Sequence, residues 1–167
     1  MPGNAPAAIA FVGLGSNLAD PMVQVRQAFT ELEAISGTRV TARSSLYRTS
    51  PVGYLEQPEF INAVASVQTT LEPRALLAAL LAIEDRHGRR RGMRNAPRTL
   101  DLDLLLYGEE VLDRDGLTLP HPRLHERAFV LAPLAEIAPE AMVPGRGRVR
   151  DLLARADCDG VSRIDAA

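Results

Sequence analysis

Four segments of the chain have the hydrophobic pattern of β-strands. Residues 8–15 form a short apolar run that ends in glycines, which is typical of a buried strand. Residues 38–49 alternate loosely between apolar and polar positions, whereas residues 60–69 alternate cleanly. In residues 100–107, leucines alternate with two aspartates. The pattern therefore predicts a strand in each of these segments.

Two further segments have apolar residues at helical spacing. Asp20 and Pro21 supply an N-cap and a first-turn proline for a helix that continues to Gly37. Pro73 opens the second helix, and Gly88 is placed to end it. The elements then follow the order strand, helix, strand, strand, helix, strand. This order predicts an α+β fold with a ferredoxin-like βαββαβ core and an antiparallel sheet.

The last third of the chain is expected to elaborate that core. A hairpin is predicted around residues 114–116, a helical segment in residues 126–137 and a short helix in residues 149–156. The length of 167 residues suits one domain, so we expect residues 1–167 to form a single domain. Residues 1–7 are expected to be a flexible N-terminal extension.

Composition places the chain among ordinary globular proteins. Apolar residues make up 46% and charged residues 24%, and no run of apolar residues is long enough to cross a membrane. The first residues lack the basic and apolar parts of a secretory signal. Cys158 is the only cysteine, which is consistent with a reducing compartment. We therefore expect a cytoplasmic protein.

The 19 residues counted as Lys or Arg are all arginines, and this excludes every mechanism that needs a lysine. A phosphate-binding loop with a lysine and a Schiff-base enzyme are among them. The arginines are concentrated in residues 86–98, although the formal net charge of the whole chain is −2. One anionic ligand held at one place fits this distribution better than a general polyanion surface.

Asp101 and Asp103 are the strongest candidates for metal binding. The strand period puts both carboxylates on the face opposite the leucines, about 6–7 Å apart along the strand. Two like charges at this separation favour a cation between them, and oxygen ligands suit Mg²⁺. A solvated strand face that happens to carry two acids is the alternative. The neighbouring arginines favour a metal site that handles a polyphosphate.

Three other features carry weaker signals. Phe60 and Asn62 share one face of their strand, and such a pair can stack on a heterocycle and hydrogen-bond to its edge. Packing in the core is an equally good explanation of that pair. His121 lies between two prolines, where a surface role is favoured. Residues 13–17, GLGSN, are interpreted as a plain turn from strand to loop, because they lack the third glycine of a dinucleotide-binding turn.

Residues 94–105, RNAPRTLDLDLL, closely resemble the signature of the 6-hydroxymethyl-7,8-dihydropterin pyrophosphokinase family of folate biosynthesis. The resemblance extends in family order from Ile9 to about Leu153. Further matching blocks are GLGSN at 13–17, SLYRT at 45–49, QPEFIN at 57–62, Ile83-Glu84, PHP at 120–122 and RAFVLAPL at 127–134.

The resemblance implies an ATP- and Mg²⁺-dependent enzyme. It would transfer the β,γ-diphosphate of ATP to the hydroxymethyl group of the pterin and release AMP, with two Mg²⁺ ions bridging the triphosphate. The matching metal ligands are Asp101 and Asp103. The residues that match the ATP site are Glu84, Arg89, Arg91, Arg98, Leu104, His121 and Arg127. Those that match the pterin site are Thr49, Val52, Phe60, Asn62 and Phe129.

Within that implied site, catalysis is assigned to Asp101, Asp103 and the arginines at 89, 91 and 98. The sequence offers no histidine base beside the attacking alcohol, so positioning and charge neutralisation would supply most of the rate. Asp101 is the nearest candidate proton acceptor. The chain departs from the family at Asn95, where many members carry a tryptophan, and at Phe60, where some carry a tyrosine.

Other function classes remain open on the sequence. A ferredoxin-like RNA-binding module could use the arginine segment, although four Phe and three Tyr are few for stacking bases on a sheet. A metal-dependent hydrolase or a nucleotide-sugar transferase could use the two aspartates. For the kinase we expect small-molecule partners only, ATP and the pterin, with no nucleic acid and no membrane, and a monomeric chain.

Overall fold

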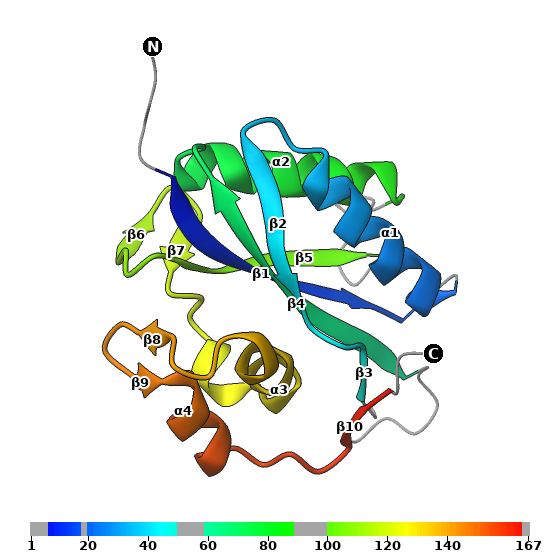
Figure 1. Ribbon diagram of the computed structural model, residues 1–167, viewed down its shortest axis with the longest axis vertical. Coiled ribbons are helices and arrows are strands. Elements are labelled where there is room, and N and C mark those ends of the chain that lie inside the picture. Colours follow the sequence, from blue (N-terminus) through cyan, green and yellow to red (C-terminus); the bar gives the residue numbers. More distant parts are fainter. Residues whose placement is uncertain (1–6, 18–19, 50–58, 89–99, 165–167) are drawn as a thin grey trace.

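The computed structural model of the protein describes residues 7–17, 20–49, 59–88 and 100–164. Within these residues, an antiparallel sheet has the order β10-β3-β4-β1-β5, and β2 pairs with β4 as well (Figure 1). Its strands are β1 (Ala8–Ser16), β2 (Thr38–Arg43), β3 (Tyr47–Thr49), β4 (Phe60–Thr69), β5 (Asp101–Tyr107) and β10 (Val161–Arg163). The fold is therefore a mixed helix and strand fold built on an antiparallel sheet.

The strand predicted for residues 38–49 is wrong as a single element. It is divided into β2 and β3, which pair with different ends of β4. The division lies at Ser44, whose backbone N–H donates to the carbonyl oxygen of Val64 and whose Oγ accepts a hydrogen bond from the N–H of Val64. The next residue, Ser45, donates from its backbone N–H and its hydroxyl to the carboxylate of Glu136. A hydroxyl thus replaces a regular strand contact at the break.

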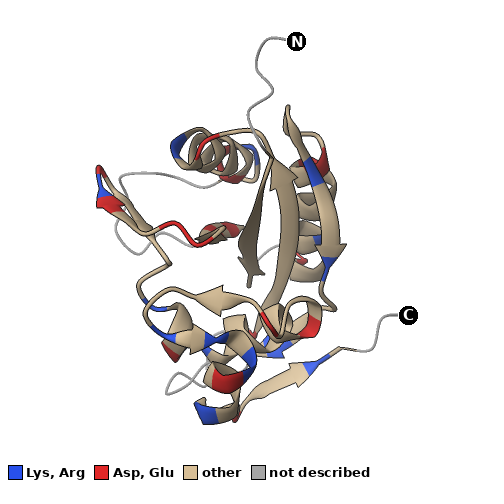
Figure 2. Ribbon diagram, turned by 60° about the vertical axis from the view of Figure 1, so that its left-hand side comes forward, with Lys and Arg blue, Asp and Glu red and all other residues tan. Residues whose placement is uncertain are grey.

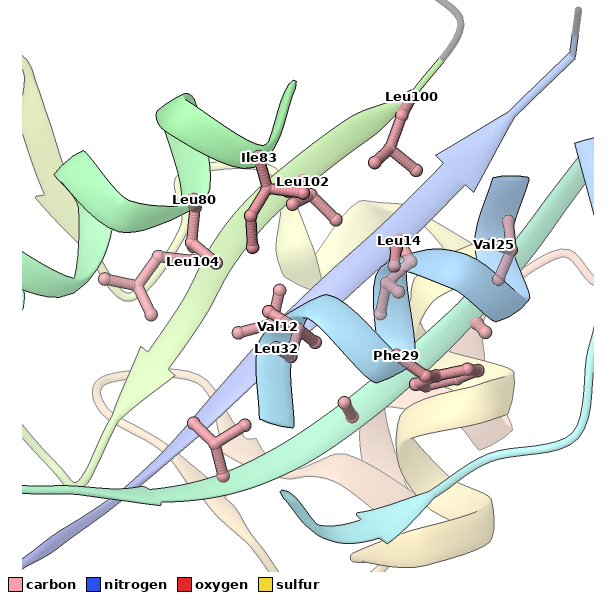
Figure 3. Close-up of a cluster of buried hydrophobic side chains, with 14 of the residues drawn as sticks. Val12, Leu14, Val25, Phe29, Leu32, Leu80, Ile83, Leu100, Leu102 and Leu104 are labelled. Carbon is pink, nitrogen blue, oxygen red and sulfur yellow. The ribbon is translucent and has the colours of Figure 1, made fainter. Parts of the chain in front are cut away.

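Helices α1 (Pro21–Glu33) and α2 (Pro73–Arg86) cover one face of the sheet (Figure 1). Asp20 occupies the N-cap position of α1, but its φ is +57° and its side chain makes no capping bond. The helix ends earlier than Gly37. Figure 3 shows leucines of β5 beside α2 and apolar residues of β1 beside α1. The residues labelled in that core are Val12, Leu14, Val25, Phe29, Leu32, Leu80, Ile83, Leu100, Leu102 and Leu104.

The opposite face carries a second apolar cluster, formed with the C-terminal elements. Val64 of β4 and Leu105 of β5 pack there with Leu131 and Leu134. The C-terminal elements of this side are η1 (Leu124–Glu126), α3 (Ala128–Ile137), β8 (Met142–Val143), β9 (Gly147–Arg148) and α4 (Val149–Arg155). Both clusters share the sheet, so residues far apart in the chain pack on its two sides.

A bulge in β5 decides which of its leucines faces which cluster. The pairing with β1 runs from Phe11 opposite Leu106 to Val12 opposite Leu104, so Leu105 is the extra residue. Leu104 therefore faces α1 and α2, whereas Leu105 and Leu106 both face α3. The alternation of the two aspartates ahead of the bulge is unaffected.

A two-residue turn at Asp115 and Gly116 connects β6 (Leu112–Arg114) to β7 (Leu117–Leu119). Both turn residues have positive φ, +54° and +81°, as a type I′ turn requires. Arg74 of α2 donates to the carbonyl oxygens of Arg114 and Asp115, at 3.1 and 3.2 Å, and holds the turn against the helix. None of the helices in the described ranges is long and apolar enough to span a bilayer.

Candidate active site

A pocket of about 420 Å³ opens on the α3 side of the sheet, beside the first turn of that helix. It gathers seven of the ten described residues that the sequence singled out for chemistry, and its lining comes from four strands and the start of α3. Its lining residues are Gly13, Leu14, Gly15, Thr49, Phe60, Asn62, Ala63, Asp101, Asp103, Arg127, Phe129 and Val130. Carboxylates, an amide, a guanidinium and two aromatic rings thus share one cavity.

The floor of the pocket is made by two glycines of β1. Gly15 lies opposite Asn62 of β4 and opposite Asp101 of β5, so these three residues form one row across the sheet. Gly13 forms the next row with Asp103. Residues that are paired across strands point to the same face of a sheet. The Asn62 amide and the Asp101 carboxylate are two strand spacings apart, or about 10 Å. Because glycine has no side chain, the space above Gly13 and Gly15 is open for a ligand.

Gly15 is also required for the position of the amide. A Cβ at this residue would lie 2.9 Å from Oδ1 of Asn62, which is closer than ordinary contacts allow. Both glycines lie inside β1, as predicted for the strand at residues 8–15, and the strand ends at Ser16, so the turn predicted for residues 13–17 begins later than its first residues. Their spacing of two residues is the signal that could have placed them on one strand face.

Thr49 and Phe60 complete the wall beside Asn62. Nδ2 of Asn62 donates to Oγ1 of Thr49 at 2.8 Å, which fixes the orientation of the amide. The side chain of Asn62 is buried, whereas Phe60 is 37% exposed and its ring is available to a ligand. An amide that is held by one acceptor and flanked by a ring can hydrogen-bond to the edge of a flat heterocycle.

The opposite wall comes from the start of α3. Arg127 is the N-cap residue of this helix, and its guanidinium lies 5.6 Å from the centroid of the Phe129 ring. This cation–π contact orients both side chains at the pocket. A positive charge and a second aromatic surface therefore face the strand residues.

Asp101 and Asp103 are half-buried and both line the pocket, as the alternation in β5 predicted. Their carboxylates lie on the face opposite Leu102 and Leu104, which are in the core. Within the described residues, no group of three or more His, Cys, Asp or Glu is arranged to hold a metal. Two carboxylates suit Mg²⁺, which completes its shell with water and phosphate oxygens, and they do not suit a structural zinc site.

His121 lies close to this pocket without lining it. Its Nδ1 accepts a hydrogen bond from the backbone N–H of Arg123, at 3.2 Å, so the proton of the neutral ring is on Nε2. Burial lowers the pKa of His121, the charge of Arg127 lowers it further, and Asp101 opposes the shift. At neutral pH the ring is an uncharged donor within electrostatic reach of both pocket residues.

Replacing Arg127 by Ala is expected to raise the pKa of His121 towards its ordinary value. The guanidinium disfavours the imidazolium form, so its removal makes protonation easier. A proton NMR titration of the imidazole signals, assigned with His121→Asn, measures the shift. The distant Arg146→Ala variant should leave the titration as it is in the wild type. An unchanged midpoint in Arg127→Ala would contradict the electrostatic contact.

Two residues assigned to ATP by resemblance do not present their side chains to the pocket. Glu84 is completely buried on α2, where its Oε2 accepts a hydrogen bond from the N–H of Leu102 at 2.7 Å. Leu104 is 4% exposed and packs on the same side of the sheet as α2. The assignments Arg89, Arg91, Arg98 and Val52 lie outside the described residues.

A pocket that joins paired carboxylates and an arginine to an amide and two rings is typical of an enzyme that transfers a phosphoryl group to a cyclic substrate. The sequence comparisons are more specific. The chain belongs to the 7,8-dihydro-6-hydroxymethylpterin-pyrophosphokinase (HPPK) family, whose sequence model matches residues 11–139.

Curated relatives carry the name 2-amino-4-hydroxy-6-hydroxymethyldihydropteridine pyrophosphokinase. The protein of Pseudomonas aeruginosa is 46% identical over 157 residues, which cover 94% of this chain and 97% of the relative. That of Haemophilus influenzae is 42% identical over 144 residues, or 86% of this chain and 90% of the relative. Among solved structures, wild-type Plasmodium falciparum HPPK-DHPS with pteroate is similar at a TM-score of 0.72 and 14% identity. The match covers 89% of this chain but 42% of that one, and it shows the fold alone.

Proposed function

We propose that this protein transfers the β,γ-diphosphate of ATP to the hydroxymethyl oxygen of 6-hydroxymethyl-7,8-dihydropterin. The products are the pterin diphosphate and AMP, and the reaction belongs to folate biosynthesis. The observation that carries the proposal is the row of Asn62, Gly15 and Asp101 across the sheet. It places an amide that can hydrogen-bond to the edge of a heterocycle and a carboxylate that can bind a metal on either side of a glycine, which has no side chain to separate them. Membership of the HPPK family supports the same activity.

The pterin is proposed to lie against the strand wall of the pocket. Phe60 and Phe129 stack on its two faces, and the Asn62 amide reads its edge. Thr49 holds that amide by accepting its hydrogen bond. Val52 completes this site by resemblance. A flat ring placed here directs its hydroxymethyl group along the glycine floor towards the carboxylates.

ATP is proposed to bind on the carboxylate side. Arg127 contacts phosphate oxygens from the start of α3, and the neutral His121 donates through Nε2. Arg89, Arg91 and Arg98 are assigned to the triphosphate by resemblance. Glu84 and Leu104 are retained in the ATP site on the same ground, and Leu104 would contact ATP through its backbone because its side chain is in the core.

Asp101 and Asp103 are the residues that would hold Mg²⁺, proposed as two ions that bind with ATP. When bound, the ions neutralise charge on the phosphate oxygens. The hydroxymethyl oxygen attacks the β-phosphorus, the bond from that phosphorus to the bridging oxygen of the α-phosphate breaks, and AMP leaves. Asp101 is proposed to accept the hydroxyl proton. The other residues position the two substrates in line.

The core from β1 to β5 is proposed to be a ferredoxin-like βαββαβ arrangement. The support is the order β5, β1 and β4, followed by β2 and β3, which both pair with β4; each of these pairs is antiparallel.

We also propose that the chain forms one domain, is monomeric and is located in the cytoplasm. Among the described residues, Figure 2 shows basic and acidic positions mixed along the helices and the β6–β7 hairpin, and this part of the surface fits small-molecule substrates better than a nucleic acid.

The experiment that tests the proposal is a coupled assay for AMP. With Mg²⁺ and ATP, purified protein should release AMP only when the hydroxymethyl pterin is present. ATP hydrolysis at the same rate without the pterin would indicate a hydrolase instead. Thermal stabilisation by a short RNA, with none by ATP, Mg²⁺ and the pterin together, would favour an RNA-binding module.

A further inference from the structure

Glu136, near the end of α3, joins three elements that surround the pterin wall of the pocket. Its carboxylate accepts hydrogen bonds from the N–H and the hydroxyl of Ser45, each at 3.0 Å, and from the hydroxyl of Tyr47 at 2.7 Å. Arg163 of β10 lies 3.8 Å from the same carboxylate. Glu136 itself does not line the pocket.

The partners of Glu136 lead directly to the residues assigned to the pterin. Tyr47 pairs in register with Asn62, so it extends the row that contains Gly15 and Asp101 by one strand. Thr49, which holds the Asn62 amide, follows two residues later on β3. The carboxylate is thus bonded to the strand that fixes one wall of the pocket.

The same helix supplies the other wall. Phe129 lies at the start of α3, seven residues before Glu136, or about 10 Å along the helix axis. Leu131 and Leu134 hold the helix on the sheet through their contacts with the apolar cluster. Hydrogen bonds are directional, so several of them to one carboxylate add a fixed direction to these apolar contacts. The bonds at Glu136 therefore fix how α3 is oriented on β3.

We infer that Glu136, acting through Ser45 and Tyr47, is a positioning residue that sets the spacing between the Phe129 and Asn62 walls of the pterin pocket. The inference rests on the proposed function, since it names a determinant of that same site. Glu136 touches neither substrate in this assignment. Its effect is on the geometry of the slot.

The protonation states of the two side chains support a permanent bond. Burial would raise the pKa of Glu136, but the hydrogen bonds from Tyr47 and Ser45 and the charge of Arg163 outweigh it, so the pKa is lowered. Burial, followed by the bond to Glu136, raises the pKa of Tyr47 to about 12. A charged acceptor and a protonated donor therefore face each other throughout the neutral range.

The test compares Glu136→Gln and Tyr47→Phe with the wild type. Glu136→Gln keeps the size of the side chain, and Tyr47→Phe keeps the ring. Each is expected to raise the KM for the pterin about fivefold or more and to leave the KM for ATP within about twofold. The double variant should be no worse than the worse single variant, because the bond that Tyr47→Phe removes is one of those that Glu136→Gln weakens. Glu140→Gln, a surface glutamate paired with Arg148 and Arg150, is the matched control and should resemble the wild type.

Calorimetry makes this test independent of turnover. Pterin affinity is measured in the presence of Mg²⁺ and a non-hydrolysable ATP analogue, and the two variants should again bind the pterin about fivefold more weakly. Unchanged pterin affinity, or an equal loss for both ligands, would overturn the positioning role. A wild-type protein that binds the pterin but forms no AMP would overturn the proposed function, while the affinities would still decide the role of Glu136.

Discussion

Asparagine at either Asp101 or Asp103 is expected to reduce turnover by at least about a hundredfold, or ~2.7 kcal/mol in the barrier. The two carboxylates are the only acidic side chains that line the pocket within the described residues. An amide of the same shape cannot supply the negative charge that holds Mg²⁺ beside a triphosphate. Each loss therefore acts on the transferred group and leaves the leucine face of β5 intact.

The measurement is kcat at saturating ATP, pterin and Mg²⁺, with circular dichroism to check the fold. Asp151→Asn, an exposed acid in the first turn of α4, is the control and should keep wild-type turnover. If both pocket variants retain more than about a tenth of the wild-type kcat, the two aspartates are a solvated strand face and not a metal site.

The sequence predicted this part of the site because its geometry is local. A strand period of two fixes the face of Asp101 and Asp103 from their own neighbours, and the leucines between them identify the core side. The same argument located Phe60 and Asn62 on the face away from Ile61. Where the alternating residues of one strand are enough to identify the core face, the strand period alone predicts which side chains lie on the opposite face.

Contacts between distant segments were not predictable in this way. Ser45, beside the break between β2 and β3, is bonded to Glu136, which lies 91 residues further along the chain. The bulge at Leu105 is a property of the pairing with β1, not of β5 alone. The hydrogen bond that Glu84 accepts from the backbone N–H of Leu102 joins α2 to β5, and no local pattern indicates it. In each case the deciding partner lies on another element.

The two floor glycines show the same limit. Both glycines fall in the strand predicted for residues 8–15, but the local pattern offers no reason for glycine at these positions other than its conformational freedom. Gly13 and Gly15 are instead needed for space, since β1 lies between two strands that carry the functional side chains. Only the register of both neighbours reveals that requirement.

Gly15→Ala and Asn62→Ala should therefore have the same consequence by different routes, a loss of pterin affinity of about tenfold or more, or ~1.4 kcal/mol. The first adds a Cβ 2.9 Å from Oδ1 of Asn62 and displaces the amide, and the second removes it. Neither change touches Arg127, so ATP affinity should fall much less.

Gly13→Ala gives a graded comparison on the same strand. Its Cβ would meet only the Leu105 side chain, at 3.4 Å or more, which is ordinary contact, so a smaller loss of pterin affinity is expected. Calorimetric titration of each variant with the pterin, and separately with ATP and Mg²⁺, measures the three effects. Equal weakening of both ligands in Gly15→Ala and Asn62→Ala would mean that this row maintains the sheet and does not recognise the pterin. The expected losses of pterin affinity are alike for Gly15→Ala and Asn62→Ala and smaller for Gly13→Ala. This order follows from the distance between a Cβ at Gly15 and Oδ1 of Asn62. A general destabilisation of the sheet would not produce the same order.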